Sequence, residues 1–314
     1  MIKPLPMRRK RLSTVGYYAS HKVKDIILGV FTAVILIGIC YTILAPVIGI
    51  ISLTFMSAED LFNPMIFLVP ANPTLYNILT AKDLMNFWLV LARTLGFSLG
   101  MGLLQVLIAS FTGYGFARYR FLFSSIVFGI VLFTIIIPVQ AYMVPLFITF
   151  RHFGPTDINL MNNHVSIFML TATGVGLRSG LFIYIFRQFF RGVPIEINEA
   201  AFIDGAGPIR TYATVMLPNA KPAIITVLLL SMVWHYGDTV YSGILLPGVF
   251  YIHSAAAGLF EAYMRGLQPF DENLMLAQMV SYAGVVLVIV PLLTIYIILQ
   301  RQFIEGIERS GIVG

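Results

Sequence analysis

Residues 199–218 read EAAFIDGAGPIRTYATVMLP and lie between two long apolar segments. Pro194 stands shortly before this stretch and can begin a helix, because the first turn of a helix does not use the N–H that proline lacks. Gly205 can end the helix in the left-handed conformation, which glycine adopts at little cost. The helix between them has about 11 residues and is about 16 Å long. Since so short a helix is marginal by itself in water, we expect it to pack against a partner protein or the inner mouth of a helix bundle.

The composition around this stretch is that of a membrane protein. Of the 314 residues, 58% are hydrophobic and 11% are charged, whereas about 25% of the residues of an average soluble domain are charged. A helix that spans a membrane needs about 20 predominantly apolar residues. Four blocks without any Asp, Glu, Lys or Arg exceed this length, namely 26–58, 94–117, 121–150 and 273–300.

Two further apolar segments contain charges. The segment 165–190 includes Arg178 and Arg187, and the segment 222–246 includes Asp238. Both are nevertheless dominated by large hydrophobic residues. We therefore expect an all-α integral membrane protein with six transmembrane helices.

The distribution of lysine and arginine predicts the orientation. Seven of them stand in the tail 1–25, and others gather at 118–120 and in 187–221. Because basic residues concentrate on the cytoplasmic side, we expect both termini and the loop 191–220 to be cytoplasmic. The expected parts are a basic tail 1–25, a first transmembrane helix 26–56, an extracytoplasmic loop 57–87, a core 88–300 that includes the loop 191–220, and a cytoplasmic tail 301–314.

Several other functions are disfavoured. The uncharged run after the basic N-terminus is too long for the apolar region of a cleaved signal peptide. The single cysteine, Cys40, excludes an internal disulfide and argues against a metal site. The net charge of +6 reflects the orientation signal and attraction to lipid headgroups, so it does not indicate binding of nucleic acid.

The sequence also lacks the motifs of an enzyme. No Gly-Lys dipeptide occurs, which excludes the usual phosphate-binding loop, G-x-x-x-x-G-K-[ST]. The five histidines are scattered without the H-x-x-x-H spacing of metal ligands, and no Ser/His/Asp arrangement is suggested. We therefore expect no catalytic residue, metal or cofactor in this chain.

The spacing within 199–218 resembles the EAA loop of ABC-importer permeases. Three residues separate Glu-Ala-Ala from Gly205, nine more precede Val215, and one residue then separates Val215 from Leu217-Pro218. The likeness extends over nearly the whole chain to the maltose-type carbohydrate permeases. It is carried by RTLGFSLGMGLLQVLIASFTGYGFARYRF (93–121), IIPVQAYMVPL (136–146), EAAFIDGAG (199–207) and QRQFIEGI (300–307).

This resemblance implies the type I importer permease fold, with six transmembrane helices and a cytoplasmic coupling helix, in a bacterial-type cytoplasmic membrane. It also implies a second permease subunit, with a heterodimer expected, and two ATP-binding cassette subunits that bind ATP and Mg. An extracytoplasmic solute-binding protein would deliver a sugar or oligosaccharide. The chain itself would not be an enzyme. The residues implied in coupling to the ATPase are Glu199, Ala200, Ala201, Asp204, Gly205, Leu217 and Pro218, with the tail 300–314 as a second contact.

Within the coupling loop, we expect Glu199 to supply the charged contact and Gly205 the required turn. The alternative is that Glu199 only caps or solvates the loop. For Pro138 and Pro145, which lie on nearly one face of the third span, kinks in the helix are favoured over contact with substrate.

The candidate residues of a translocation pathway are Arg178, Tyr236 and Asp238. Arg178 lies about 13 Å along a helix from Arg187, hence near mid-membrane, where a charge is expected to be functional. We expect it to face an anionic or heavily hydroxylated solute, and the alternative is a structural ion pair or a bond to backbone carbonyls. The sequence departs from the family at Arg93, where Asn is frequent, and at Tyr236-Gly237, where Trp-Asn is frequent.

Two other classes of function remain as alternatives. A secondary transporter or channel that works without ATP is expected to have broken helices at matching positions in two halves, or several intramembrane carboxylates; the sequence suggests neither. A membrane sensor or assembly subunit is expected to carry an appended signalling domain, and none is apparent.

Overall fold

The computed structural model describes residues 12–265, 267–268 and 271–311. Within these residues the secondary structure is helical, and Phe153 and Ile158 form an isolated β-bridge. The prediction of an all-α protein is thus confirmed for the described chain. The chain divides into two compact units, Met1–Thr74 and Leu75–Gly314. Residues 1–11 of the predicted basic tail and 312–314 of the predicted C-terminal tail lie outside the described residues.

The first unit contains the helices α1 (Leu12–Phe55) and α2 (Ala58–Leu61). The part of α1 over Lys24–Phe55 is long and apolar enough to cross a membrane. After α2, the carboxylate of Asp60 accepts hydrogen bonds from the backbone N–H (2.7 Å) and the side-chain amide (3.1 Å) of Asn72. The N–H of Thr74 then donates to the carbonyl of Phe55 (2.8 Å). These bonds close residues 56–73 into an ordered loop.

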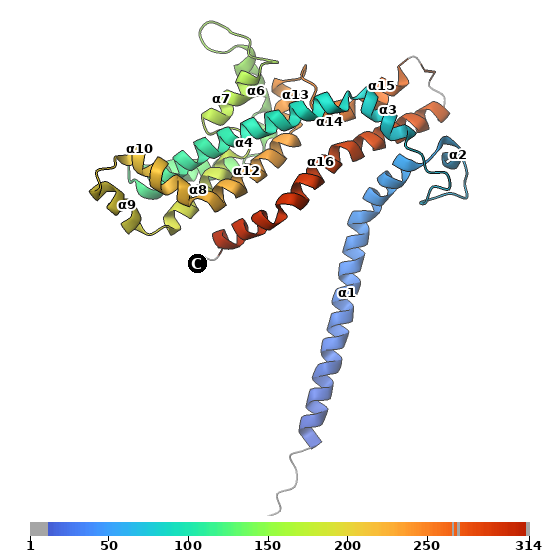
Figure 1. The fold of residues 1–314 in the computed structure, drawn as a ribbon, viewed down its shortest axis with the longest axis horizontal. Helices are drawn as coiled ribbons and strands as arrows, with labels where there is room; N and C mark the ends of the chain where they lie inside the picture. Colours follow the sequence, from blue (N-terminus) through green and yellow to red (C-terminus); the bar gives the residue numbers. More distant parts are fainter. Residues whose placement is uncertain (1–11, 266, 269–270, 312–314) are drawn as a thin grey trace, which may run out of the picture. The chain divides into compact units, whose positions relative to one another are not determined.

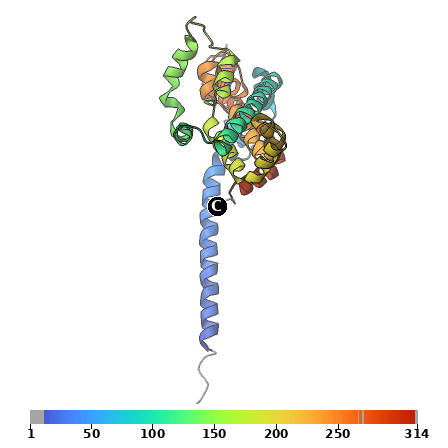
Figure 2. The ribbon, with the colours of Figure 1, turned by 90° about the vertical axis from the view of Figure 1, so that its left-hand side faces the viewer.

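The second unit is a helix bundle (Figure 1). The helix α4 (Phe87–Arg118) packs along α8 (Ser179–Gly192) and α12 (Lys221–Tyr236), and α16 (Asp271–Gly311) packs along α12. The helix α5 (Ser124–Ile136) packs on α8, so that α5 and α16 flank the bundle (Figure 2).

Short helices occupy the two ends of this bundle (Figure 1). At one end lie α9 (Ile195–Ile203) and α10 (Pro208–Thr211), next to the end of α4. At the opposite end lie α3 (Tyr76–Leu84), α14 (Ile252–Ala257) and α15 (Leu259–Met264). The chain between α10 and α12 forms a π-helical turn, η2 (Tyr212–Met216), and α11 (Leu217–Asn219).

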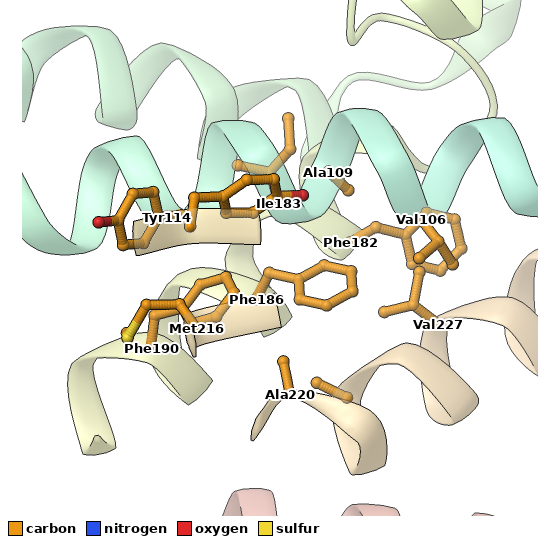
Figure 3. Packing of buried hydrophobic residues seen from close by; sticks show 12 residues of the cluster. Val106, Ala109, Tyr114, Phe182, Ile183, Phe186, Phe190, Met216, Ala220 and Val227 are labelled. Atoms are coloured by element: carbon orange, nitrogen blue, oxygen red, sulfur yellow. The ribbon is translucent and has the colours of Figure 1, made fainter. Parts of the chain in front are cut away.

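The core between α4, α8 and α12 is built on one stripe of α8 (Figure 3). Phe182, Phe186 and Phe190 recur every four residues and are fully buried, because positions four apart lie on one face of a helix. At Gly113 of α4, an added Cβ would lie 2.7 Å from the Cβ of Phe186 and 2.9 Å from the backbone nitrogen of Arg187. Glycine therefore lets the two backbones approach closely, as is common between membrane helices.

Three of the six predicted spans are not single helices. The predicted third span divides into α5 and α6 (Met143–Arg151), which are joined by the turn η1 (Val139–Ala141). The fourth divides into α7 (His164–Ala172) and α8, and the fifth into α12 and α13 (Val240–Leu245). By length and composition, three helices among the described residues could each cross a membrane, or four if the pair Pro208–Asn219 and Lys221–Tyr236, bent by 80°, is counted as one.

At Pro138 the helix ends, whereas the sequence predicted only a kink. Ile137 and Pro138 are extended, with ψ of 120° and 136°, and α5 ends there. Proline disfavours the helical conformation of the residue before it, which explains a complete break. Pro145 falls in the first turn of α6, where proline is tolerated.

Candidate functional site

The stretch around Glu-Ala-Ala folds as predicted into a short helix, α9, although it has 9 residues and Pro194 lies just before its first turn. Gly205 has a φ of 80°. Its N–H donates to the carbonyl of Phe202 (3.0 Å), and the N–H of Ala206 donates to that of Ala201 (3.0 Å). This pair of bonds is a Schellman motif. Gly205 thus ends α9 in the left-handed conformation.

Polar contacts hold α9 against the end of α4. The hydroxyl of Tyr114 donates to the side-chain oxygen of Asn198 (3.0 Å), and Asn198 is only 6% exposed. Arg118 donates to the carbonyl of Val193 just before α9 (2.6 Å). The sequence analysis did not identify these three side chains. Tyr114 and Arg118 are polar residues in the last turns of an apolar span, and Asn198 lies within the short helix itself; neither position indicates the contact.

The opposite face of α9 is open. Glu199, Ala200 and Asp204 are exposed, whereas Ala201 is buried against the bundle. Glu199 makes no hydrogen bond or ion pair with any described residue, so it does not cap α9. Pro218 is exposed and Leu217 is half-buried. Large apolar side chains share the open surface, which we call the α9 face: Ile195, Phe202, Ile203 and Ile209.

A cavity of about 670 Å³ lies where three helical segments are interrupted. It is bounded by the breaks between α5 and α6, between α7 and α8, and between α12 and α13. Backbone that leaves the helix at membrane depth is tolerated only where protein or a cavity surrounds it. The polar side chains that line the cavity include Gln140, Tyr142, Arg178, Asp238 and Tyr241.

Arg178 lines this cavity from the start of α8. Its backbone is left-handed, with a φ of 58°, and the residue precedes the first turn of the helix. The guanidinium carbon lies 5.5 Å from the centre of the Trp234 ring, a distance typical of a cation–π contact. The side chain is exposed and makes no ion pair or hydrogen bond with a described residue. The structure therefore does not contain the ion pair or carbonyl bond that was the alternative explanation.

Asp238 also lines the cavity, but its carboxylate accepts hydrogen bonds from backbone N–H groups. One oxygen accepts the N–H groups of Val240 and Tyr241 (3.1 Å each), and the other accepts that of Ser242 (2.8 Å). These are N–H groups at the beginning of α13, which have no partner within the helix. Asp238 therefore acts as a cap.

Tyr236 lies apart from the other two candidates. Its side chain is 2% exposed, and its hydroxyl donates to the carbonyl of Val288 in α16 (2.9 Å). It does not line the cavity. Arg178 and Asp238 therefore line one cavity, and Tyr236 lies outside its lining. Two residues that the sequence did not indicate, Tyr142 and Tyr241, also line the cavity, and a hydrogen bond of 2.6 Å joins their hydroxyl groups.

The model of the family described as binding-protein-dependent transport system inner membrane component matches residues 105–309, which is more than half of the chain. The chain belongs to this family. The match includes α9, its glycine cap and every break that borders the cavity. The first unit lies outside it.

Curated relatives of this inner membrane component are sugar permeases. The maltodextrin transport system permease protein of Bacillus subtilis (strain 168) is 28% identical over 226 residues, 71% of this chain and 74% of the relative. The melibiose/raffinose/stachyose import permease protein of the same organism is 28% identical over 221 residues, 70% of this chain and 72% of the relative. The galactooligosaccharides transport system permease protein of B. subtilis (strain 168) is 24% identical over 300 residues, 94% of this chain and 99% of the relative.

A solved structure has the same fold. It belongs to a bacterial ABC transporter involved in the import of the acidic polysaccharide alginate. The TM-score is 0.68 at 22% sequence identity, with 96% of this chain and 100% of the other covered. At this identity the likeness concerns the fold of the inner membrane component alone.

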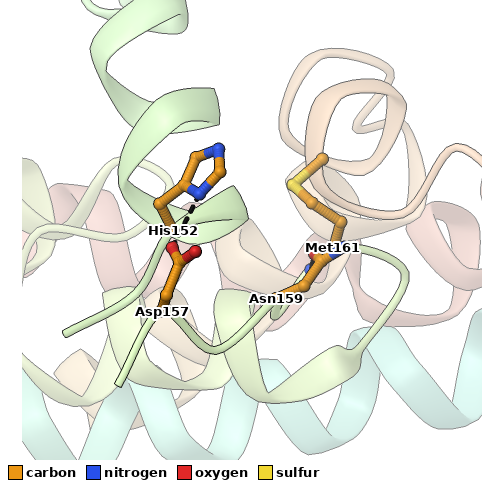
Figure 4. Close-up of polar contacts among 4 residues, drawn as sticks. All are labelled: His152, Asp157, Asn159 and Met161. Atoms are coloured by element: carbon orange, nitrogen blue, oxygen red, sulfur yellow. Dashed lines mark hydrogen bonds and ion pairs between the residues drawn. The ribbon is translucent and has the colours of Figure 1, made fainter. Parts of the chain in front are cut away.

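The inner membrane component also has an ordered loop between α6 and α7 (Figure 4). Nδ1 of His152 lies 2.7 Å from a carboxylate oxygen of Asp157. The side-chain oxygen of Asn159 accepts the N–H of Met161 (2.9 Å). These contacts order the loop between α6 and α7.

Proposed function

We propose that this chain is the permease subunit of an ATP-driven, binding-protein-dependent importer that carries a sugar or oligosaccharide across the cytoplasmic membrane. The family membership and the sugars named for its relatives support this function. The observation that carries the proposal within the chain is the α9 face. It is an open helix surface with a free carboxylate, Glu199, beside exposed apolar side chains, and it belongs to a chain without a phosphate-binding loop of its own.

The α9 face is the proposed contact for the ATP-binding cassette subunits. Exposed apolar side chains rimmed by polar residues are typical of protein interaction sites. The Schellman motif at Gly205 and the bond between Tyr114 and Asn198 hold α9 as a rigid body on the bundle. Movement of an ATPase subunit against α9 would therefore move the end of α4 with it.

The helix α8 offers a direct connection from the α9 face to the cavity. It ends at Gly192, two residues before Pro194 and α9, and it begins beside Arg178 on the cavity wall. A helix of this length spans about 21 Å. Its buried phenylalanines and the close contact at Gly113 fix α8 to α4. We infer that displacement of α9 tilts α4 and α8 together and changes access to the cavity.

We further propose six crossings, with the termini and the α9 face in the cytoplasm. The crossings are α1, α4, the pair α5 and α6, the pair α7 and α8, the pair α12 and α13, and α16. The importer would contain a second permease subunit, two ATPase subunits and an extracytoplasmic solute-binding protein. The distribution of lysine and arginine supports this orientation.

An ATP-independent secondary transporter remains the second candidate, because broken helices favour it. The sequence suggested none, whereas the described chain has three such breaks that meet at one cavity. Broken helices therefore do not distinguish the two functions in this protein. The cavity lining has one carboxylate, Asp238, and its oxygens already accept backbone N–H groups. Ion coupling at this cavity has no free acid to use.

Purification of the chain from its native membrane tests the proposed function. We expect an ATP-hydrolysing subunit to copurify. In proteoliposomes, Glu199→Lys should reduce ATP-driven uptake at least tenfold and Glu199→Ala several-fold. Glu196→Ala is the matched control, because Glu196 is an exposed glutamate of the same helix. If no ATPase copurifies and Glu199→Lys leaves ATP-driven uptake intact, the importer function is wrong.

A further inference from the structure

The guanidinium of Arg178 has unused capacity for binding. It carries five N–H donors, and no described residue accepts from it or pairs with it. Trp234 covers one side of it, at 5.5 Å from the guanidinium carbon to the ring centre. The remaining donors border a cavity of about 670 Å³. A charge at membrane depth requires a partner or a water-filled space.

The cavity wall provides no partner for this charge. Among the described residues that line the cavity, Asp238 is the only acid and Arg178 the only base. The two make no ion pair within 4.0 Å, and three backbone N–H groups of α13 hold the carboxylate of Asp238. A switch of that carboxylate to Arg178 would leave these N–H groups without acceptors. Because unpaired buried donors are costly, we expect Asp238 to stay a cap.

The rest of the lining suits a carbohydrate. Apolar side chains and backbone form most of the wall, and polar contacts come from Gln140 and from the hydroxyl pair of Tyr142 and Tyr241. Ligand pockets commonly have volumes of about 300–1,000 Å³ with a few polar groups in an apolar wall. The cavity falls within this range.

We propose that this cavity binds a carboxylate-bearing carbohydrate, such as a short oligouronate, and that Arg178 pairs with the sugar carboxylate. This inference rests on the proposed function and names the class of solute. The planar guanidinium matches the two oxygens of a carboxylate, and the cation–π contact with Trp234 holds it at the cavity wall. A neutral sugar would leave the charge unpaired, so the site distinguishes the two classes of solute.

Trp234 provides a direct test of binding. The sequence has two tryptophans, and the other, Trp88, is 69% exposed on α4. A full-length Trp88→Phe variant in lipid nanodiscs therefore reports the emission of Trp234 alone. Trigalacturonate and maltotriose, which have equal numbers of sugar units but differ in charge, are the probes. We expect trigalacturonate to change the emission and to bind at least tenfold more tightly than maltotriose.

Variants of two arginines identify the group responsible. Arg178→Gln should weaken trigalacturonate binding roughly ten- to hundredfold, as expected for lost hydrogen bonds to a charged group. The affinity of Arg178→Lys should lie between those of the parent and Arg178→Gln, since lysine keeps the charge but lacks the planar guanidinium. Arg191→Gln is the matched control, because Arg191 is an exposed arginine of the same helix that does not line the cavity. It should bind as the parent does.

Three results of the binding experiment would overturn the inference. They are no response of Trp234 to trigalacturonate, equal or tighter binding of maltotriose, and unchanged trigalacturonate affinity in Arg178→Gln. If Arg178→Gln does not fold, the relative affinities of trigalacturonate and maltotriose for the Trp88→Phe protein still test the inference. ATP-driven import of neutral sugars alone would overturn this inference and leave the proposed function intact. The absence of an ATPase partner would instead remove the proposed function.

Discussion

The hydroxyl of Tyr114 in α4 donates to the side-chain oxygen of Asn198 in α9 at 3.0 Å. This contact joins a long helix of the bundle to the short helix that carries Glu-Ala-Ala. Asn198 is 6% exposed, so its oxygen has little access to water. The bond therefore holds α9 on the bundle, and in the proposed importer we expect it to transmit movement from α9 to α4.

Loss of this bond should weaken coupling. In Tyr114→Phe the oxygen of Asn198 is left buried without its donor, which typically costs about 1–3 kcal/mol. We expect a lower melting temperature and a several-fold loss of ATP-driven uptake. Tyr119→Phe serves as the control, because Tyr119 contacts the hydroxyl of Tyr114 (3.2 Å) but not Asn198. Equal uptake by the parent and Tyr114→Phe would contradict the coupling role of this bond.

The left-handed turn after α9 should require glycine. Gly205 has a φ of 80°, and an added Cβ would meet no atom within 4 Å. The penalty for Gly205→Ala is therefore conformational, about 1–2 kcal/mol. We expect weaker retention of the ATPase subunit on purification. Gly207→Ala, at a φ of −71° and also in open space, should retain it; similar behaviour of the two variants would argue against the turn as the cause.

The contact between α4 and α8 should not tolerate a side chain at Gly113. A Cβ there would lie 2.9 Å from the backbone nitrogen of Arg187, and backbone cannot move aside as a flexible side chain can. Overpacking of this kind costs about 1–3 kcal/mol. Thermal unfolding of Gly113→Ala should occur at a lower temperature than that of Gly115→Ala, where a Cβ meets nothing within 4 Å. Melting temperatures equal to that of the parent protein in both variants would contradict close packing at Gly113.

We expect Asp238 to contribute to the stability of the protein and not to the binding of a charged solute. Asp238→Ala removes the acceptors of three N–H groups in the first turn of α13, and loss of a helix cap costs about 0.5–2 kcal/mol. Asp238→Asn keeps one side-chain acceptor and should recover part of the melting temperature. A specific loss of solute binding in Asp238→Asn, at unchanged stability, would instead place the carboxylate in contact with solute.

Much of the loop 191–220 could be predicted because its signals are local. Proline before the helix, glycine after it and the Glu-Ala-Ala spacing all act within a few residues. The long uncharged blocks 26–58, 94–117 and 273–300 each coincide with most of a helix that is able to cross a membrane. For these three helices, the length of the uncharged block was sufficient to predict a membrane-spanning helix.

The cavity could not be predicted, because its parts meet only in three dimensions. Tyr142 and Tyr241 are 99 residues apart in the chain, and an apolar segment gives no sign of where its helix stops. Pro138 did give a signal, but a proline can either kink or end a helix. Asp238 also had a local signal, since acidic residues cap helices. It was interpreted instead as a charge within a continuous span.

The decisive measurement for an ATP-driven importer is uptake of a radiolabelled sugar into proteoliposomes that contain the purified complex and its solute-binding protein. We expect uptake with hydrolysable ATP on the side of the α9 face, none with a non-hydrolysable analogue, and at least a tenfold loss in Glu199→Lys. Uptake that continues without ATP and follows an ion gradient, with Glu199→Lys unchanged, would contradict it.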